Sequence, residues 1–139
     1  FVVPSFAAQI AAIEAGLQPA VMQVGNLDAE RDFLDVDDVI SAYFSVIQHV
    51  AALESGSVFN ISSDQPRSIR SILDELLSQS PEAIQVELDP ARLRPSDIPR
   101  VQADSGLLRQ LTGWSPVVPW HETLAAILEQ QRVLLQTKP

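Results

Sequence analysis

One segment, from Gly25 to Val39, constrains the fold of this chain more than any other. Its sequence is GNLDAERDFLDVDDV, and a short apolar run, Val21–Val24, comes directly before it. Such a run predicts a strand, and the Gly25-Asn26 pair that follows predicts a turn at its end. Apolar residues at helical spacing come after the segment. We therefore expect it to connect two packed layers of the fold instead of forming a surface tail.

The second half of this segment predicts extended chain and then a helix. Phe33–Val36 is largely apolar, and Asp37 or Asp38 then offers a carboxylate to the free amides of a helix start. The spacing of Asp35 and Asp37 also occurs in magnesium-dependent phosphoryl-transfer sites, but the only lysine is Lys138 near the end, so capping is the simpler interpretation. The residues that follow at helical spacing predict a well-buried helix: Val39, Ile40, Tyr43, Phe44, Ile47 and Val50.

Three stretches of the chain, taken in order, resemble one protein family. They are the Gly-Asn-Leu-x-Ala-x-Arg-Asp-Phe-x-x-Val-x-Asp-Val pattern of residues 25–39, Phe1-Val2-Val3 before a helix, and Arg94-Pro95-Ser96-Asp97 with Gly113-Trp114-x-Pro116 behind it. The chain is thereby similar to the C-terminal half of the extended short-chain dehydrogenase/reductases, the NAD-dependent epimerase/dehydratase family that acts on nucleotide sugars. It most resembles the branch of GDP-mannose 4,6-dehydratase and GDP-4-keto-6-deoxy-D-mannose reductase.

The resemblance implies a fold and a set of substrate-binding residues. The implied fold is an α/β piece with a small sheet and about five helices, in which residues 1–139 are the substrate-binding part and the N-terminal Rossmann half is absent. Arg31 matches the family's arginine at the nucleotide diphosphate, Arg94 and Asp97 match the pair that holds the nucleotide end, and Val2 matches an apolar contact beside the substrate. From the residues alone, the alternative is that Arg31 pairs with neighbouring carboxylates and Arg94 is solvated.

The residue at position 5 bears on which branch the chain resembles. The dehydratase branch tends to carry a lysine there, whereas this chain has Ser5, preceded by Pro4. We therefore favour the reductase, or a related epimerase-like member, over the dehydratase. The resemblance implies a GDP-sugar as substrate and leaves the sugar open.

The sequence lacks the catalytic groups of the family. Hydride transfer needs a glycine-rich turn for the dinucleotide, and the family adds a Tyr-x-x-x-Lys pair. The glycines, at positions 16, 25, 56, 106 and 113, form no such turn, and Tyr43, the only tyrosine, is followed by Ile47 at the lysine position. We expect no catalytic residue, no bound metal and no hydride transfer in this chain alone, with NAD or NADP serving the intact parent.

Two interpretations of the whole chain remain open. It begins with Phe1 instead of Met, which favours a fragment of a longer enzyme. The alternative is a standalone, non-catalytic module that binds a nucleotide sugar or a protein. If a half is missing, apolar surface on Phe1–Leu17 and on the helix from Val39 is uncovered, and we expect the chain to form homo-oligomers.

Composition excludes several classes of partner. The net charge is -9, whereas nucleic acids and anionic membranes are bound by clustered positive charge. No apolar run approaches the length of a bilayer span. The chain has no cysteine, which excludes a disulfide and a thiolate metal site and fits a cytoplasmic protein.

Further elements are predicted along the chain. Helices are expected from Ser5 to Leu17, from a Ser68 cap to Leu77, from Ser105 to Gly113 and after Pro119, and Trp114 is expected in the core. Strands are expected at Val58–Ile61, Ile84–Leu88 and Val101–Ala103.

Overall fold

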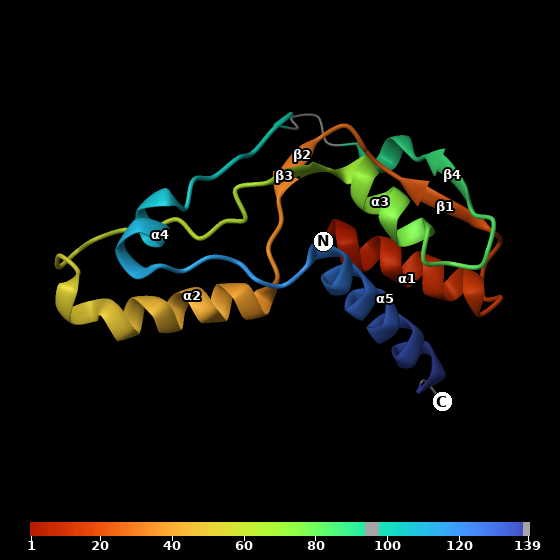
Figure 1. Ribbon diagram of the computed structural model, residues 1–139. Helices are drawn as coiled ribbons and strands as arrows, with labels where there is room; N and C mark the ends of the chain where they lie inside the picture. Colours follow the sequence, from red (N-terminus) through yellow and green to blue (C-terminus); the bar gives the residue numbers. More distant parts are fainter. Residues whose placement is uncertain (94–97, 138–139) are drawn as a thin grey trace. The chain divides into compact units, whose positions relative to one another are not determined.

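The computed structural model describes residues 1–93 and 98–137, and it confirms the predicted α/β class. Within these residues the chain forms five α-helices and two sheets of two strands each (Figure 1). The chain divides into two compact units. The first comprises Phe1–Ala29, Ser68–Pro99 and His121–Pro139, and the second comprises Glu30–Arg67 and Arg100–Trp120.

The first unit is built on a parallel strand pair. Strand β1, Val21–Val24, pairs with β4, Gln85–Leu88, with Val21 opposite Gln85. Helix α1, Val2–Glu14, packs against β1 and against α3, Ile69–Leu77. The long helix α5, Trp120–Gln136, completes the buried core, which contains Phe6, Ile10, Met22, Ile72, Leu73, Leu76, Leu124 and Leu128.

Two helices of this unit test the predicted helix ends. The Ser68 cap is confirmed, because its hydroxyl accepts the amide of Ser71 at 3.0 Å. The predicted bounds of α1, Ser5 to Leu17, are wrong at both ends, since the helix runs from Val2 to Glu14. Pro4 lies in the first helical turn. Proline is tolerated there, because backbone N–H groups of the first turn have no acceptor within the helix. Gly16 follows the end of α1 with φ of +68°, the left-handed conformation that ends many helices.

The second unit packs two helices around a tryptophan. Helix α2, Val36–His49, contacts α4, Gly106–Thr112, and the strands are β2, Glu30–Asp32, and β3, Pro66–Ser68. Trp114 is buried here, as predicted, and its indole N–H donates to the Ser41 hydroxyl at 2.8 Å. The core consists of Ala42, Leu108 and Trp114, with Leu34, Val46, Phe59 and Ile61 partly buried against it.

The start of α2 differs from the predicted cap. Asp35, not Asp37 or Asp38, caps the helix by accepting the amide of Asp37 at 2.9 Å. The carboxylate of Asp38 is buried and accepts the amides of Val117 at 2.8 Å and Val118 at 3.2 Å. The sequence around Asp38 has the pattern of a helix cap, but the Asp38 carboxylate binds backbone amides of a segment far along the chain.

The prediction that α2 is well buried is wrong for one of its faces. Its inner face carries the buried residues Asp38 and Ala42, but the apolar residues of its outer face are exposed. By contrast, the apolar residues of α1 are mostly buried within the first unit. Of the large apolar residues in positions 1–17, only Phe1 and Leu17 are exposed.

The strand predictions had mixed outcomes. Val21–Val24 is confirmed, and the strand predicted at 84–88 forms at Gln85–Leu88. Val58–Ile61 is not a strand, and Val101–Ala103 shows only the neighbouring bridge between Glu30 and Arg100. In each failure the local sequence favours extended chain, but a strand also needs a neighbouring backbone with which to pair.

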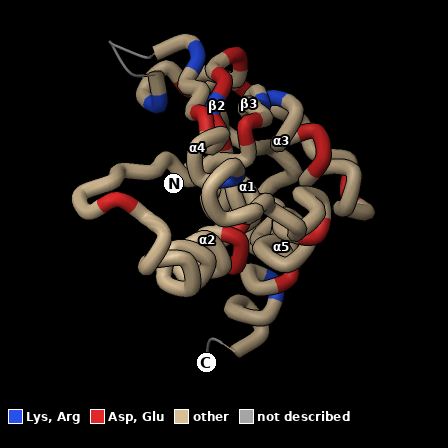
Figure 2. The backbone as a smooth tube through the Cα atoms, turned by 60° about the vertical axis from the view of Figure 1, so that its left-hand side comes forward, with Lys and Arg blue, Asp and Glu red and all other residues tan. Residues whose placement is uncertain are grey.

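The excess of acidic over basic residues in the sequence is present in both units. Acidic positions outnumber basic ones along the backbone of both units (Figure 2). Among the described helices, none is both long enough and apolar enough to span a membrane.

Candidate functional site

Arg31, the predicted diphosphate ligand, lies in the middle of β2. Its guanidinium donates to the Glu30 carbonyl at 2.7 Å, and the residue is half-buried. The next residue, Asp32, fixes the strand by accepting the Ser63 amide and hydroxyl, both at 2.8 Å, and the Asp64 amide at 3.0 Å. Arg31 is therefore carried on a strand that the Asp32 carboxylate ties to Ser63 and Asp64.

The loop that carries Arg94 and Asp97 ends close to Arg31. Arg100 forms an ion pair with the carboxylate of Glu30 at 3.3 Å, and the amide of Val101 donates to the Glu30 carbonyl at 3.0 Å. Because Glu30 immediately precedes Arg31, this end of the loop is fixed beside the predicted diphosphate ligand.

The same loop begins in the first unit, at the carboxyl ends of the parallel strands. The Asp89 amide donates to the Val24 carbonyl at 2.8 Å, and a 3-10 turn, η2, spans Pro90–Arg92. A Cβ on Gly25 would lie 2.7 Å from the Arg92 carbonyl oxygen. Gly25 is thus required for a close backbone approach, and not for the positive φ that a turn glycine often supplies.

The predicted site residues differ in what the structure shows of them. Arg31 is on β2 in the second unit, and Val2 is the first residue of α1 in the first unit, where it is half-buried. Arg94 and Asp97 lie outside the described residues. The structure therefore places both ends of the arginine-bearing loop, one against Gly25 and one against Glu30.

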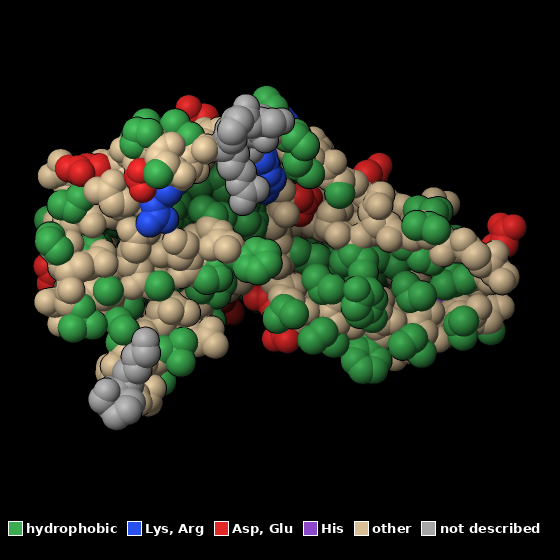
Figure 3. Space-filling model, turned by 180° about the vertical axis from the view of Figure 1, so that it is seen from behind, with side chains coloured by type: hydrophobic (Ala, Val, Ile, Leu, Met, Phe, Trp, Pro, Cys, Tyr) green, Lys and Arg blue, Asp and Glu red, His purple; other side chains and the backbone are tan. Residues whose placement is uncertain are grey.

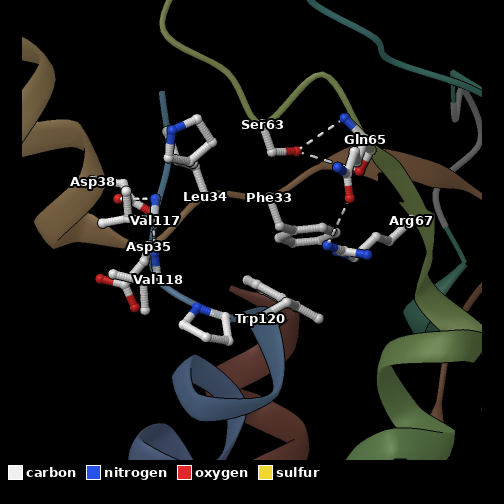
Figure 4. A pocket seen from close by; sticks show the side chains of 12 residues that line it. Phe33, Leu34, Asp35, Asp38, Ser63, Gln65, Arg67, Val117, Val118 and Trp120 are labelled. Atoms are coloured by element: carbon white, nitrogen blue, oxygen red, sulfur yellow. Dashed lines mark hydrogen bonds between the residues drawn. The ribbon is translucent and has the colours of Figure 1, made fainter. Parts of the chain in front are cut away.

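A pocket of about 210 Å³ lies in the second unit, next to the ends of β2 and β3 (Figure 4). Phe33 and Trp120 form its aromatic wall, with ring centroids 5.6 Å apart. The Arg67 guanidinium lies over the Trp120 ring, 5.4 Å from its centroid. The other lining residues are Leu34, Asp35, Asp38, Ser63, Gln65 and Pro116–Pro119.

Two N–H groups of this pocket are buried donors without an acceptor among the described residues, Arg67 Nε and Trp120 Nε1. Buried polar groups are normally hydrogen-bonded, so an oxygen acceptor or a water is expected at this position. The sequence analysis did not identify Arg67, because only the pairing of β3 with the distant β2 brings it to the pocket.

The segment that carries Ser63 and Gln65 is held in place by Asp64. Its φ is +60°, an uncommon conformation for a residue with a side chain. The Asp64 carboxylate accepts the Ser105 amide at 2.9 Å and hydroxyl at 2.7 Å, and pairs with Arg109 at 3.1 Å. Burial opposes ionisation of Asp64, but the hydrogen bonds from Ser62 and Ser105 and the charge of Arg109 outweigh it and lower its pKa.

The residues present do not fit a nicotinamide dinucleotide. Such a cofactor needs a glycine-rich turn between a strand and a helix. Among the described residues, β1 leads through Gly25 into β2, and no helix begins there. Tyr43 is exposed on α2, one helical turn before Ile47. No group of three or more potential metal ligands occurs in the described part of the chain.

Comparison with known proteins assigns this architecture to a family. The profile of the family described as GDP-mannose 4,6 dehydratase matches residues 1–127. The GDP-6-deoxy-D-mannose reductase of Pseudomonas aeruginosa is 39% identical over 128 residues, which are 92% of this chain and 41% of the reductase. The chain thus spans about two fifths of the length of that relative.

Solved structures agree with the sequence relatives. RMD from Pseudomonas aeruginosa, in complex with NADPH, superposes with a TM-score of 0.87 at 35% identity, over 96% of this chain and 43% of RMD. A putative epimerase from Burkholderia cenocepacia superposes with a TM-score of 0.81 at 29% identity, over 96% of this chain and 41% of the epimerase.

Proposed function

This chain belongs to the GDP-mannose 4,6-dehydratase family of extended short-chain dehydrogenase/reductases, and from that premise we propose that it is a nucleotide-sugar-binding part. Its parent is an NAD(P)-dependent GDP-4-keto-6-deoxy-mannose reductase or GDP-mannose 4,6-dehydratase, with GDP-sugar as the ligand. The reductase is favoured by Ser5 and by the 39% identity to a reductase.

The observation that carries the proposal is the arrangement around Arg31. A nucleotide diphosphate is anionic, and an arginine binds it with charge-assisted, often bidentate hydrogen bonds. Arg31 lies on β2. The loop that carries Arg94 and Asp97 ends beside it, because Arg100 pairs with Glu30 and the Val101 amide donates to the Glu30 carbonyl. We infer that Arg31 binds the diphosphate, that Arg94 and Asp97 hold the nucleotide end, and that Val2 contacts the substrate.

In this proposal the chain supplies recognition and not hydride transfer. When bound in the parent, NAD or NADP supplies the hydride. The residues described above bind and orient the sugar nucleotide, and none of them is proposed to transfer a proton. A Rossmann half would hold the dinucleotide, so the cleft of the parent would be completed by polypeptide other than residues 1–139.

Calorimetric titration with GDP-mannose, with UDP-glucose as the comparison ligand, tests the proposal. In a preparation that binds GDP-mannose, Arg31→Ala and Arg94→Ala are each expected to weaken binding by about 1.5 to 3 kcal/mol, the scale of a hydrogen bond to a charged group. Arg70→Ala is the matched control, because Arg70 forms an exposed ion pair with Asp28. An unchanged dissociation constant in both test variants would contradict the assignment.

The alternative is a standalone module without catalysis. It predicts that the 139-residue chain alone binds GDP-mannose, whereas the parent-enzyme proposal predicts tight binding only when a dinucleotide-binding half is also present. Sequencing the codons upstream of Phe1 discriminates directly between them. A glycine-rich unit and a Tyr-x-x-x-Lys pair encoded there would support the enzyme, and a nearby start codon would support the module.

A further inference from the structure

The pocket walled by Phe33 and Trp120, which we call the aromatic pocket, contains two polar groups that the proposed function does not use. They are Arg67 Nε and Trp120 Nε1, both buried and without an acceptor among the described residues. All the residues that line the pocket belong to the second unit, so one compact part of the chain forms its walls. Because buried N–H groups are normally hydrogen-bonded, two unpartnered donors in one pocket indicate a ligand that supplies oxygen acceptors.

Arg67 supplies a positive charge at this pocket. Its guanidinium lies 5.4 Å from the centroid of the Trp120 ring. Among the described residues Arg67 forms no ion pair, and its Nη2 donates a long hydrogen bond of 3.4 Å to the side chain of Gln65. An arginine binds a carboxylate through the planar array of its N–H donors, of which Nε is one. Arg67 therefore offers both a charge and an unused donor to an anionic group.

Two carboxylates also line the pocket, but each already accepts backbone amides. Asp38 accepts the two amides of residues 117 and 118, and Asp35 accepts the amide of Asp37 at the start of α2. Both lie on the side of the pocket away from Arg67 (Figure 4). The pocket therefore has a separate end at which an anion meets a cation.

The remaining wall is flat and largely apolar. The rings of Phe33 and Trp120 are 5.6 Å apart between centroids and inclined by 37°, and Leu34 and Val118 also line the pocket. The volume of about 210 Å³ exceeds the roughly 150 Å³ of a protein cavity that accommodates benzene. The pocket can therefore hold one six-membered ring that carries a carboxylate.

We propose that the aromatic pocket binds a small organic carboxylate with a planar, apolar body. Its carboxylate accepts the Arg67 Nε and Trp120 Nε1 donors, and its body lies against the rings of Phe33 and Trp120. Arg31 does not line this pocket, and the inference does not require that the chain binds a GDP-sugar. The net charge of -9 disfavours anions in general, so affinity for a carboxylate depends on a local site of this kind.

The indole N–H groups of the two tryptophans provide the test. Trp120 Nε1 has no acceptor among the described residues, whereas Trp114 Nε1 donates to the Ser41 hydroxyl at 2.8 Å. Sodium benzoate is titrated into the isotope-labelled 139-residue chain, and the two indole signals are followed by NMR. We expect the Trp120 signal to shift and saturate, because its N–H gains an acceptor next to the added ring. The Trp114 signal should stay in place, and it verifies that the second unit is folded.

Two further probes separate the contribution of charge from that of the ring. Benzamide keeps the ring and a carbonyl oxygen but carries no charge, and sodium acetate keeps the carboxylate without the ring. We expect each to bind at least about tenfold more weakly than benzoate, because one loses a charge-assisted hydrogen bond and the other loses the apolar contact. Acetate that binds as tightly as benzoate would contradict the apolar body of the ligand.

Substitutions assign the site to its two donors. Arg67→Gln removes the charge and Nε, and Trp120→Phe keeps an aromatic wall but removes the indole N–H. Each is expected to weaken benzoate binding at least about tenfold, measured from backbone amide signals of the pocket, with the Trp114 signal verifying the fold. Arg70→Gln is the matched control, because Arg70 is an exposed arginine that pairs with Asp28, and it should leave the dissociation constant unchanged.

Three results would overturn the inference. One is a Trp120 signal that none of the three probes shifts in a chain with the Trp114 signal of the folded state, which would leave water as the acceptor. Another is benzoate binding that both Arg67→Gln and Trp120→Phe leave unchanged. The third is GDP-mannose that shifts the Trp120 signal and excludes benzoate, since the pocket would then belong to the proposed substrate site. Benzoate binding in a chain that does not bind GDP-mannose would support this site and contradict the proposed function alone.

Discussion

Arg132 on α5 donates two hydrogen bonds, of 2.7 and 2.8 Å, to the carboxylate of Glu14 on α1. It donates a third, of 3.1 Å, to the Gln79 carbonyl. The two side chains are 28% and 15% exposed, so water screens the pair only in part. Arg132→Ala leaves a mostly buried carboxylate without its partner, and we expect a loss of roughly 2 to 4 kcal/mol in the free energy of unfolding. Urea denaturation measures it, and Arg92→Ala, which removes an exposed pair with Asp89, should cost far less.

The same pair predicts a pH dependence. The hydrogen bond from Arg132 lowers the pKa of Glu14, and burial opposes this only in part. A carboxyl with a lowered pKa in the folded state stabilises the fold above its ordinary pKa, and this contribution is lost as the pH falls through the folded value. We expect wild type to lose more stability than Glu14→Gln between neutral pH and the acidic side of the ordinary carboxyl range. Equal losses in the two proteins, followed by urea denaturation across pH, would contradict this.

Asp38 gives a second stability prediction. Its buried carboxylate accepts the amides of Val117 and Val118, so Asp38→Ala leaves both amides without that acceptor. We expect a loss of about 2 to 3 kcal/mol, the scale of hydrogen bonds to a charged group. Asp38→Asn keeps one carbonyl acceptor and should cost less. Asp37→Ala is the control, because Asp37 is exposed at the first turn of α2. Thermal unfolding of the three variants would show the order.

The sequence predicted best what local chemistry determines. The Ser68 cap, the helix that runs from it to Leu77, and the position of β1 each depend on residues close together in the chain. Trp114 was recognised as a core residue from its type and setting, and the structure buries it against Ala42 and Leu108. The family resemblance was confirmed by a profile match over residues 1–127.

What the sequence did not predict depends on distant partners. Asp38 has the pattern of a helix cap, but its partners are Val117 and Val118. Arg67 reaches the aromatic pocket only because β3 pairs with β2. Val58–Ile61 has the composition of a strand, which local propensity recognises, but its pairing depends on a backbone elsewhere. The site predictions for Arg31, Arg94, Asp97 and Val2 stay predictions, since they came from resemblance.

Gly25 links the fold to the proposed site. A Cβ there would approach the Arg92 carbonyl oxygen to 2.7 Å, so Gly25→Ala must displace the turn from which the Arg94 loop starts. In a preparation that binds GDP-mannose, we expect at least about tenfold weaker binding, because small displacements of positioning groups are costly. Gly56→Ala is an informative control for stability, since its φ of +84° also strains the variant, but its Cβ meets no atom. Weak binding in both variants would indicate that stability, and not the loop position, is responsible.

The exposed apolar residues on the outer face of α2 and at the start of the turn that follows it make a last prediction about the chain on its own. They are Val36, Ile40, Tyr43, Phe44, Ile47 and Val50. Figure 3 shows hydrophobic side chains gathered over this helix. Without a partner, this stripe is exposed to water, and burial of apolar area drives association. We expect the average mass by light scattering to rise with protein concentration, and Phe44→Glu to suppress the rise. Leu17→Glu should not suppress it, because most apolar residues of the preceding helix α1 are buried, so that Leu17 does not extend an exposed apolar stripe. A constant monomer mass at high concentration, or equal suppression by both substitutions, would show that α2 does not drive the association.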